Sequence, residues 1–98
     1  MSYDVLSAVV TGTAVAAKCA ANSSYAERLY GSITNTVISV NGDADYVSFR
    51  EACDLLSIWM GLPYEDVFDM FYHLGGTLPI DNEVAYDLGG LGIELSRA

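Results

Sequence analysis

The sequence predicts a mainly α-helical fold, a compact bundle of four to five short helices in a single domain that spans residues 1–98. Apolar residues make up 52% of the chain and charged residues 17%, a composition typical of a compact fold rather than of a disordered chain. Apolar side chains recur at helical spacing in several segments, and residues that begin and end helices flank them. A chain of this length buries one core, and no repeat or linker indicates a second domain.

The first helix is expected from about Tyr3 to Ala20, with Ser2 as its N-cap. Its inward-facing candidates are Val5, Val9, Ala16 and Cys19. Asp4 stands where a signal peptide carries Lys or Arg, and the apolar stretch of residues 5–17 is too short to span a bilayer. The sequence therefore predicts a cytoplasmic protein that does not enter a membrane.

A second helix is expected from Tyr25, opened by a capping box of Ser24 and Glu27. Apolar residues at i+3 and i+4 spacing favour its continuation to Gly42: Leu29, Ile33, Val37 and Val40. A strand is the open alternative for residues 34–40, which are rich in β-branched residues and lead into Asn41-Gly42, a favoured hairpin turn. The periodicity favours the helix.

The central segment, residues 48–74, is expected to hold two helices joined by a tight turn. Ser48 and Glu51 have the spacing of a capping box. Gly61 suits the left-handed conformation that ends a helix, and Pro63 suits the first turn of the next. Residues at helical spacing are expected to pack between the two helices: Leu56, Trp59, Val67, Met70, Phe71 and Leu74.

The end of the chain combines a short helix with an extended segment. Gly75 and Gly76 are expected to end the fourth helix, and Asp81 can cap a fifth helix that reaches Leu88. The last ten residues alternate apolar side chains at Leu91, Ile93 and Leu95, which indicates either a tail strand or an arm packed on the bundle.

The charge of the chain is strongly negative and unevenly distributed. The net charge is −9, and all of the excess lies in residues 41–98. Such a surface repels nucleic acid and anionic membranes and favours a basic protein partner. The alternative is an acidic surface that only keeps the protein in solution.

A partner-binding surface is predicted in this later half, where aromatic residues stand beside the acidic ones. Tyr64, Phe68 and Tyr72 are spaced i, i+4 and i+8, and Glu65, Asp66 and Asp69 fall on an adjacent face of the same helix. The predicted partner-binding residues are Asp43, Asp45, Glu51, Asp54, Tyr64, Glu65, Asp66, Asp69 and Tyr72.

In size, acidity and lack of catalytic motifs the whole chain resembles the small phage proteins that block restriction or CRISPR machinery. The resemblance is compositional and transfers no individual residue. It implies a non-enzymatic inhibitor of the anti-CRISPR or antirestriction type, without cofactor, that imitates DNA charge and occupies a basic nucleic-acid-binding site. The protein would act as a monomer or small homo-oligomer.

An alternative function comes from residues 41–51, which resemble an EF-hand loop between two helices. Asn41, Asp43, Asp45 and Glu51 supply oxygens in nearly the spacing that calcium requires. The glycine expected after Asp45 is absent, so the loop is one residue short. This resemblance implies a degenerate calcium-binding or regulatory module.

Two further patterns overlap the central helices. Residues 56–67 resemble a helix-turn-helix, but the second helix would present Glu65, Asp66 and Asp69 to DNA phosphates, so a plain corner between two helices is the better interpretation. A small enzyme using Cys53 and His73 is the third functional alternative. Cys19 and Cys53 both lie among apolar residues and are predicted to be buried free thiols.

Overall fold

The computed structural model describes residues 12–74 and 78–98 of the chain. The expectations for Ser2, Val5, Val9, Gly75 and Gly76 lie outside these residues. The elements along the chain are α2 (Thr13–Ala21), α3 (Ser23–Ile33), β1 (Thr36–Val40), β2 (Asp43–Tyr46), α4 (Phe49–Met60), α5 (Tyr64–Phe71), the 3-10 helix η1 (Tyr72–Leu74), α6 (Asn82–Gly89) and β3 (Ile93–Arg97).

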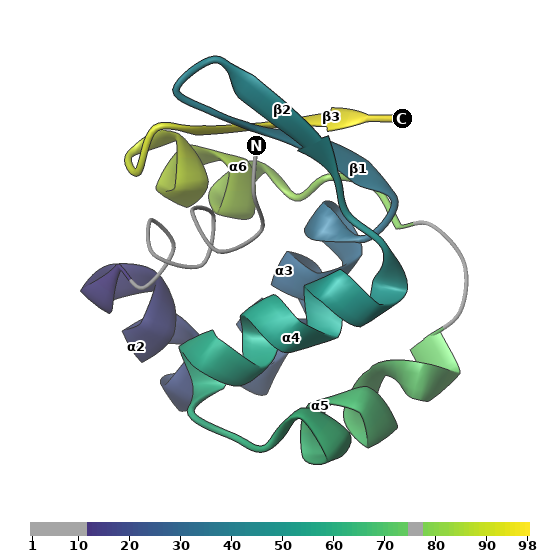
Figure 1. Ribbon diagram of the computed structural model, residues 1–98. Helices are drawn as coiled ribbons and strands as arrows, with labels where there is room; N and C mark the ends of the chain where they lie inside the picture. The colour runs from purple at the N-terminus through teal and green to yellow at the C-terminus, as the bar shows by residue number, and fades with distance from the viewer. Residues whose placement is uncertain (1–11, 75–77) are drawn as a thin grey trace.

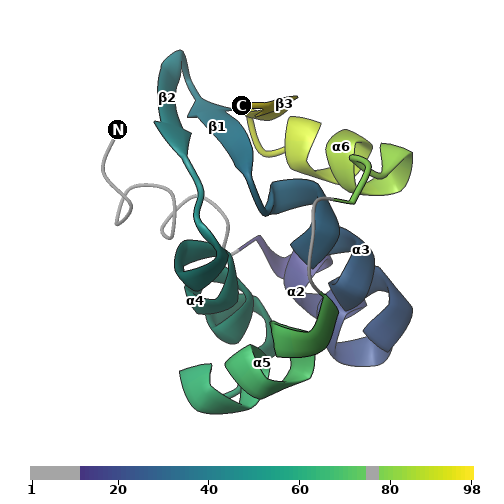
Figure 2. The ribbon, with the colours of Figure 1, turned by 90° about the vertical axis from the view of Figure 1, so that its right-hand side faces the viewer.

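The mainly helical prediction is confirmed, but a small antiparallel sheet replaces the pure bundle. The sheet has three strands in the order β2-β1-β3, so the first strand lies in the middle and pairs with both others. Figures 1 and 2 show the sheet at one end of the molecule and α5 at the opposite end, with α3 and α4 between them. The C-terminal segment forms β3, which confirms the tail strand.

The prediction of a helix over residues 34–40 is wrong, and the strand alternative is right. Within β1, Thr36, Ile38 and Val40 are buried while the residues between them are only partly covered, which is the period of a strand. Asn41 and Gly42 form the two-residue hairpin turn with φ of 51° and 92°. The β-branched residues and this turn together outweigh the apolar spacing that also fits a helix.

Of the predicted helix caps in the described part of the chain, Ser48 and Asp81 are confirmed and Ser24 is not. Asn22, not the predicted Ser24, caps α3 by accepting hydrogen bonds from the amides of Ser24 and Tyr25. The Ser48 hydroxyl accepts from the Glu51 amide, and the Asp81 carboxylate accepts from the Val84 amide, as predicted. Gly61 ends α4 with φ of 67°, where only the absence of a side chain avoids strain.

The core lies where α3, α4 and α5 meet. Its largest fully buried side chains include Leu29, Ile33, Leu55, Leu56 and Phe71. The rings of Tyr30 and Phe71 stack with centroids 4.6 Å apart, which joins α3 to α5. Cys19 and Cys53 are buried free thiols, as predicted.

Ion pairs attach α6 to α2 and α3. Lys18 Nζ lies 2.7 Å from Asp87 and 3.1 Å from Glu83, and Arg28 lies 2.7 Å from Glu83 and 3.2 Å from Asp81. We call these five residues, together with Tyr25, the α6 clamp. The Tyr25 hydroxyl donates to Asp87 at 2.8 Å.

Candidate functional site

The predicted acidic helix, α5, has one packed face and one charged face. Val67 and Phe71 are buried against the core, whereas Glu65, Asp66 and Asp69 are exposed, which confirms the predicted division. The prediction that Met70 packs inward is wrong. Met70 is 46% exposed, and the buried residues of α5 are Val67 and Phe71.

Three aromatic residues form a row beside the carboxylates, along α5 and into η1. The ring centroids of Tyr64 and Phe68 are 6.0 Å apart and those of Phe68 and Tyr72 are 5.5 Å apart. Phe68 also meets Phe49 of α4 edge to face at 5.1 Å. The row is therefore anchored to the core through Phe68, while Tyr72 is 61% exposed.

Two adjoining surface pockets lie between α4 and α5. The first, of about 300 Å³, is lined by Arg50, Tyr64, Glu65, Phe68 and Asp69. The second, of about 420 Å³, shares Arg50 and Tyr64 with the first and adds Glu51 and Asp54. We call these seven residues the α4/α5 groove. It is lined by four carboxylates, two aromatic rings and one guanidinium.

The groove unites five of the nine predicted partner-binding residues: Glu51, Asp54, Tyr64, Glu65 and Asp69. Asp45 is close enough to this set to act on Glu51, whose pKa is raised by burial and then by the charge of Asp45. Tyr72 ends the aromatic row. Asp66 lines neither pocket, and Asp43 lies one residue beyond the turn of the hairpin.

Two groove residues were absent from the predicted set. Phe68 has the spacing of the aromatic row that the sequence shows, and its side chain is half-buried. Arg50 carried no local signal beyond its position four residues before Asp54 on α4, where the two side chains share a face.

Most cations of the chain lie away from the groove. Lys18 and Arg28 belong to the α6 clamp. Arg97 donates to the carbonyl oxygens of Thr34 at 2.8 Å and Gly31 at 3.1 Å, so it caps the end of α3. Burial lowers the pKa of Arg97. Arg50 alone among these four lines the groove, so the electrostatic character of the groove is acidic.

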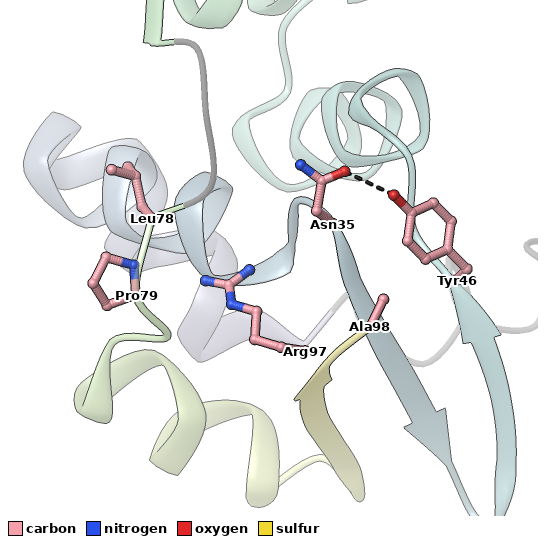
Figure 3. A pocket seen from close by; sticks show the side chains of 6 residues that line it. All are labelled: Asn35, Tyr46, Leu78, Pro79, Arg97 and Ala98. Carbon is pink, nitrogen blue, oxygen red and sulfur yellow. Dashed lines mark hydrogen bonds between the residues drawn. The ribbon is translucent and has the colours of Figure 1, made fainter.

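A larger pocket, of about 590 Å³, opens at the sheet end and is lined by Asn35, Tyr46, Leu78, Pro79, Arg97 and Ala98 (Figure 3). The polar side chains that line it form hydrogen bonds with other groups of the protein. The Tyr46 hydroxyl donates to Asn35 Oδ1 at 2.7 Å, and two amino groups of Arg97 hold the end of α3. Size alone would favour this pocket, but its polar groups serve the fold.

The EF-hand interpretation does not match the backbone. Residues 41–51 run through a hairpin turn and β2 before α4, whereas an EF-hand loop connects two helices. Asn41 lies at the hairpin-turn end of the sheet, where its Oδ1 is 3.3 Å from the place of a Cβ on Gly92, just before β3. Within residues 12–74 and 78–98, no group of three or more His, Cys, Asp or Glu side chains is placed to hold a metal ion.

The Cys53 and His73 alternative lacks a reactive thiol. Cys53 is fully buried in α4, and burial raises its pKa to about 11. The thiol is therefore protonated at neutral pH. His73 lies exposed in η1.

No helix within the described part of the chain is long and apolar enough to cross a membrane. Comparison of the sequence with protein families and curated proteins, and of the fold with solved structures, found no match.

Proposed function

We propose that the protein is a non-enzymatic binding module that presents the α4/α5 groove to a basic site on a nucleic-acid-handling protein. The observation that carries the proposal is the composition of the groove. Four carboxylates lie there beside two aromatic rings, and the groove contains a single guanidinium of opposite charge.

The two kinds of side chain would serve different steps of binding. Carboxylates attract a basic patch over a distance and reject acidic proteins and nucleic acids. Aromatic rings supply the buried contact area that stabilises a complex once it has formed. A purely solubilising surface needs the first but not the second, which favours a binding face.

An inhibitor is the form of binding that fits this surface best. A protein that fills a basic nucleic-acid-binding site with carboxylates excludes the phosphates that the site serves. The small size and the acidity of the chain agree with an inhibitor of the anti-CRISPR or antirestriction type, and we retain this class as our proposal.

Charge reversal in the groove tests the proposal. The immobilised protein is offered the phosphocellulose-binding fraction of a cell lysate, with and without excess duplex DNA. We expect capture of basic proteins that DNA displaces, and a loss of roughly tenfold or more in the double variant Glu65→Lys/Asp69→Lys, because like charges meet a basic site.

The matched control reverses two exposed glutamates outside the groove, Glu27 of α3 and Glu94 of β3. Both variants change the net charge equally, and circular dichroism checks that both stay folded. Equal capture by the two variants would show that only total charge matters and would overturn the proposal. Capture that DNA does not displace would reject inhibition of nucleic-acid binding.

A further inference from the structure

Four of the five residues that line the first pocket of the groove lie on α5, and the fifth, Arg50, lies on α4. Tyr64 and Phe68 lie one helical turn apart with ring centroids separated by 6.0 Å and planes tilted by 35°. Glu65 and Asp69 are also one helical turn apart, so the two carboxylates lie beside the two rings in the lining of the pocket. The volume of about 300 Å³ is enough for one side chain of a partner.

This combination suits a guanidinium group in particular. A guanidinium is planar and weakly hydrated, so it stacks on aromatic faces while its N–H groups donate to carboxylates at its edge. An ammonium group is a compact, strongly hydrated point charge and gains less from the rings. A phosphate or other anion would meet two carboxylates and is disfavoured.

We propose that this pocket receives an arginine side chain of the basic partner, with the guanidinium over Tyr64 and Phe68 and its N–H groups donating to Glu65 and Asp69. The inference rests on the proposed function and adds which residue of the partner is recognised. It makes the pocket the specific anchor of the interface and leaves the other acidic residues as steering charge.

Arg50 gives the proposal a distinctive consequence. Its side chain lines the same pocket but takes part in none of the four ion pairs that the described residues form. An incoming guanidinium must therefore share the pocket with a like charge. Removal of that charge should strengthen binding of an arginine ligand, whereas it would weaken binding of any anion.

The test is isothermal titration of the folded protein with a capped tri-arginine peptide and with the tri-lysine peptide of equal charge, at low salt. We expect the arginine peptide to bind several-fold more tightly. Glu65→Gln/Asp69→Gln should weaken it roughly tenfold, since hydrogen bonds to charged groups are lost. Tyr64→Leu should weaken it about two- to fivefold and reduce the preference for arginine. Arg50→Gln should strengthen it.

The control Glu27→Gln/Glu94→Gln carries the same change in charge and should bind the arginine peptide as the wild type does. Equal affinity for both peptides, or loss of affinity in Arg50→Gln, would overturn the arginine pocket. The proposed function would survive that result if Glu65→Lys/Asp69→Lys still abolished DNA-displaceable capture. If the peptides discriminate as expected but capture is unaffected, the pocket is supported and the proposed function fails.

Discussion

Single residues on α4 separate the core from the surface within one turn. Leu55 and Leu56 are 0% exposed, whereas Ile58 is 42% exposed. Trp59 returns to the interior at 4% exposed. Leu55, Leu56 and Trp59 therefore lie on the buried face of α4. Removal of the Leu56 side chain leaves a cavity that the neighbouring helices cannot fill without moving.

Leu56→Ala is expected to lower the free energy of unfolding by about 2–5 kcal/mol, because it removes buried methyl groups and leaves a cavity. Ile58→Ala, an aliphatic truncation on the exposed side of the same helix, should cost less than about 1 kcal/mol. Urea denaturation followed by circular dichroism measures both values. Similar losses would mean that α4 is rotated relative to the faces described above.

At the scale of elements, the α6 clamp joins three helices through polar contacts at the surface. Lys18 comes from α2, Tyr25 and Arg28 come from α3, and the carboxylates come from α6 or its cap. The hydrogen bond from Lys18 and then that from Tyr25 lower the pKa of Asp87. Hydrogen bonds from Arg28 and Lys18 likewise lower the pKa of Glu83.

These shifts predict how stability responds to acid. A carboxyl whose pKa is lower in the folded state stabilises the protein above its unfolded pKa, near 3.8 for Asp87, and this contribution is lost as the pH falls through the folded value. Asp87→Asn should therefore be less stable than the wild type at neutral pH and lose less stability below about pH 4. Urea denaturation across a pH series measures the slope.

Lys18→Met provides an independent check, since it removes the cation that contributes most to lowering the pKa of Asp87. It should flatten the acid response in the same direction. An Asp87→Asn variant that keeps the wild-type slope would show that the clamp does not couple folding to protonation.

The hairpin predicts the response to calcium. Asn41 belongs to a tight turn and Asp43 and Asp45 to a strand, so the oxygens do not encircle a common centre. Millimolar calcium should leave the melting temperature unchanged, because only a ligand that binds the native state preferentially raises it. Magnesium at equal concentration controls for ionic strength. A rise with calcium alone would restore the EF-hand alternative.

Local sequence specifies the ends of the helices but not the pairing of the strands. Caps at Ser48 and Asp81 and the stop at Gly61 act within one turn, so the sequence alone was enough to predict them. The strand β1 was misassigned because its apolar residues satisfy two periods at once. Its partner β3 lies more than fifty residues away, and that pairing makes β1 the central strand.

In the candidate site, too, the features within one helix were predictable from the sequence, and those that depend on tertiary contacts were not. The charged and packed faces of α5 follow from helical spacing alone. The pocket needs α4 beside α5, and the place of Arg50 in it depends on that tertiary contact. The separation of the cations from the groove is also tertiary, since Lys18 meets Asp87 across sixty-nine positions of the chain.

At the scale of the whole molecule, charge is segregated. The α6 clamp matches cations with carboxylates, whereas the groove holds an acidic excess, and Figures 1 and 2 show α6 beside the sheet and α5 at the opposite end. Like charges held close together destabilise a folded protein through mutual repulsion. We therefore expect the groove to cost stability that a neutral surface would keep.

The dependence of the melting temperature on salt tests for this cost in stability. Raising NaCl from about 10 mM to about 500 mM shortens the screening length from roughly 30 Å to a few ångström, which weakens repulsion among the carboxylates and also the exposed ion pairs of the clamp. With a net charge of −9 the repulsion is expected to dominate, so the melting temperature should rise with salt.

In Glu65→Lys/Asp69→Lys the rise should be smaller, because two repelling charges have become attractive ones. Glu27→Lys/Glu94→Lys separates this local effect from total charge and should keep more of the wild-type rise. A melting temperature that falls with salt would show that the α6 clamp, not the acidic groove, governs the electrostatic stability of the molecule.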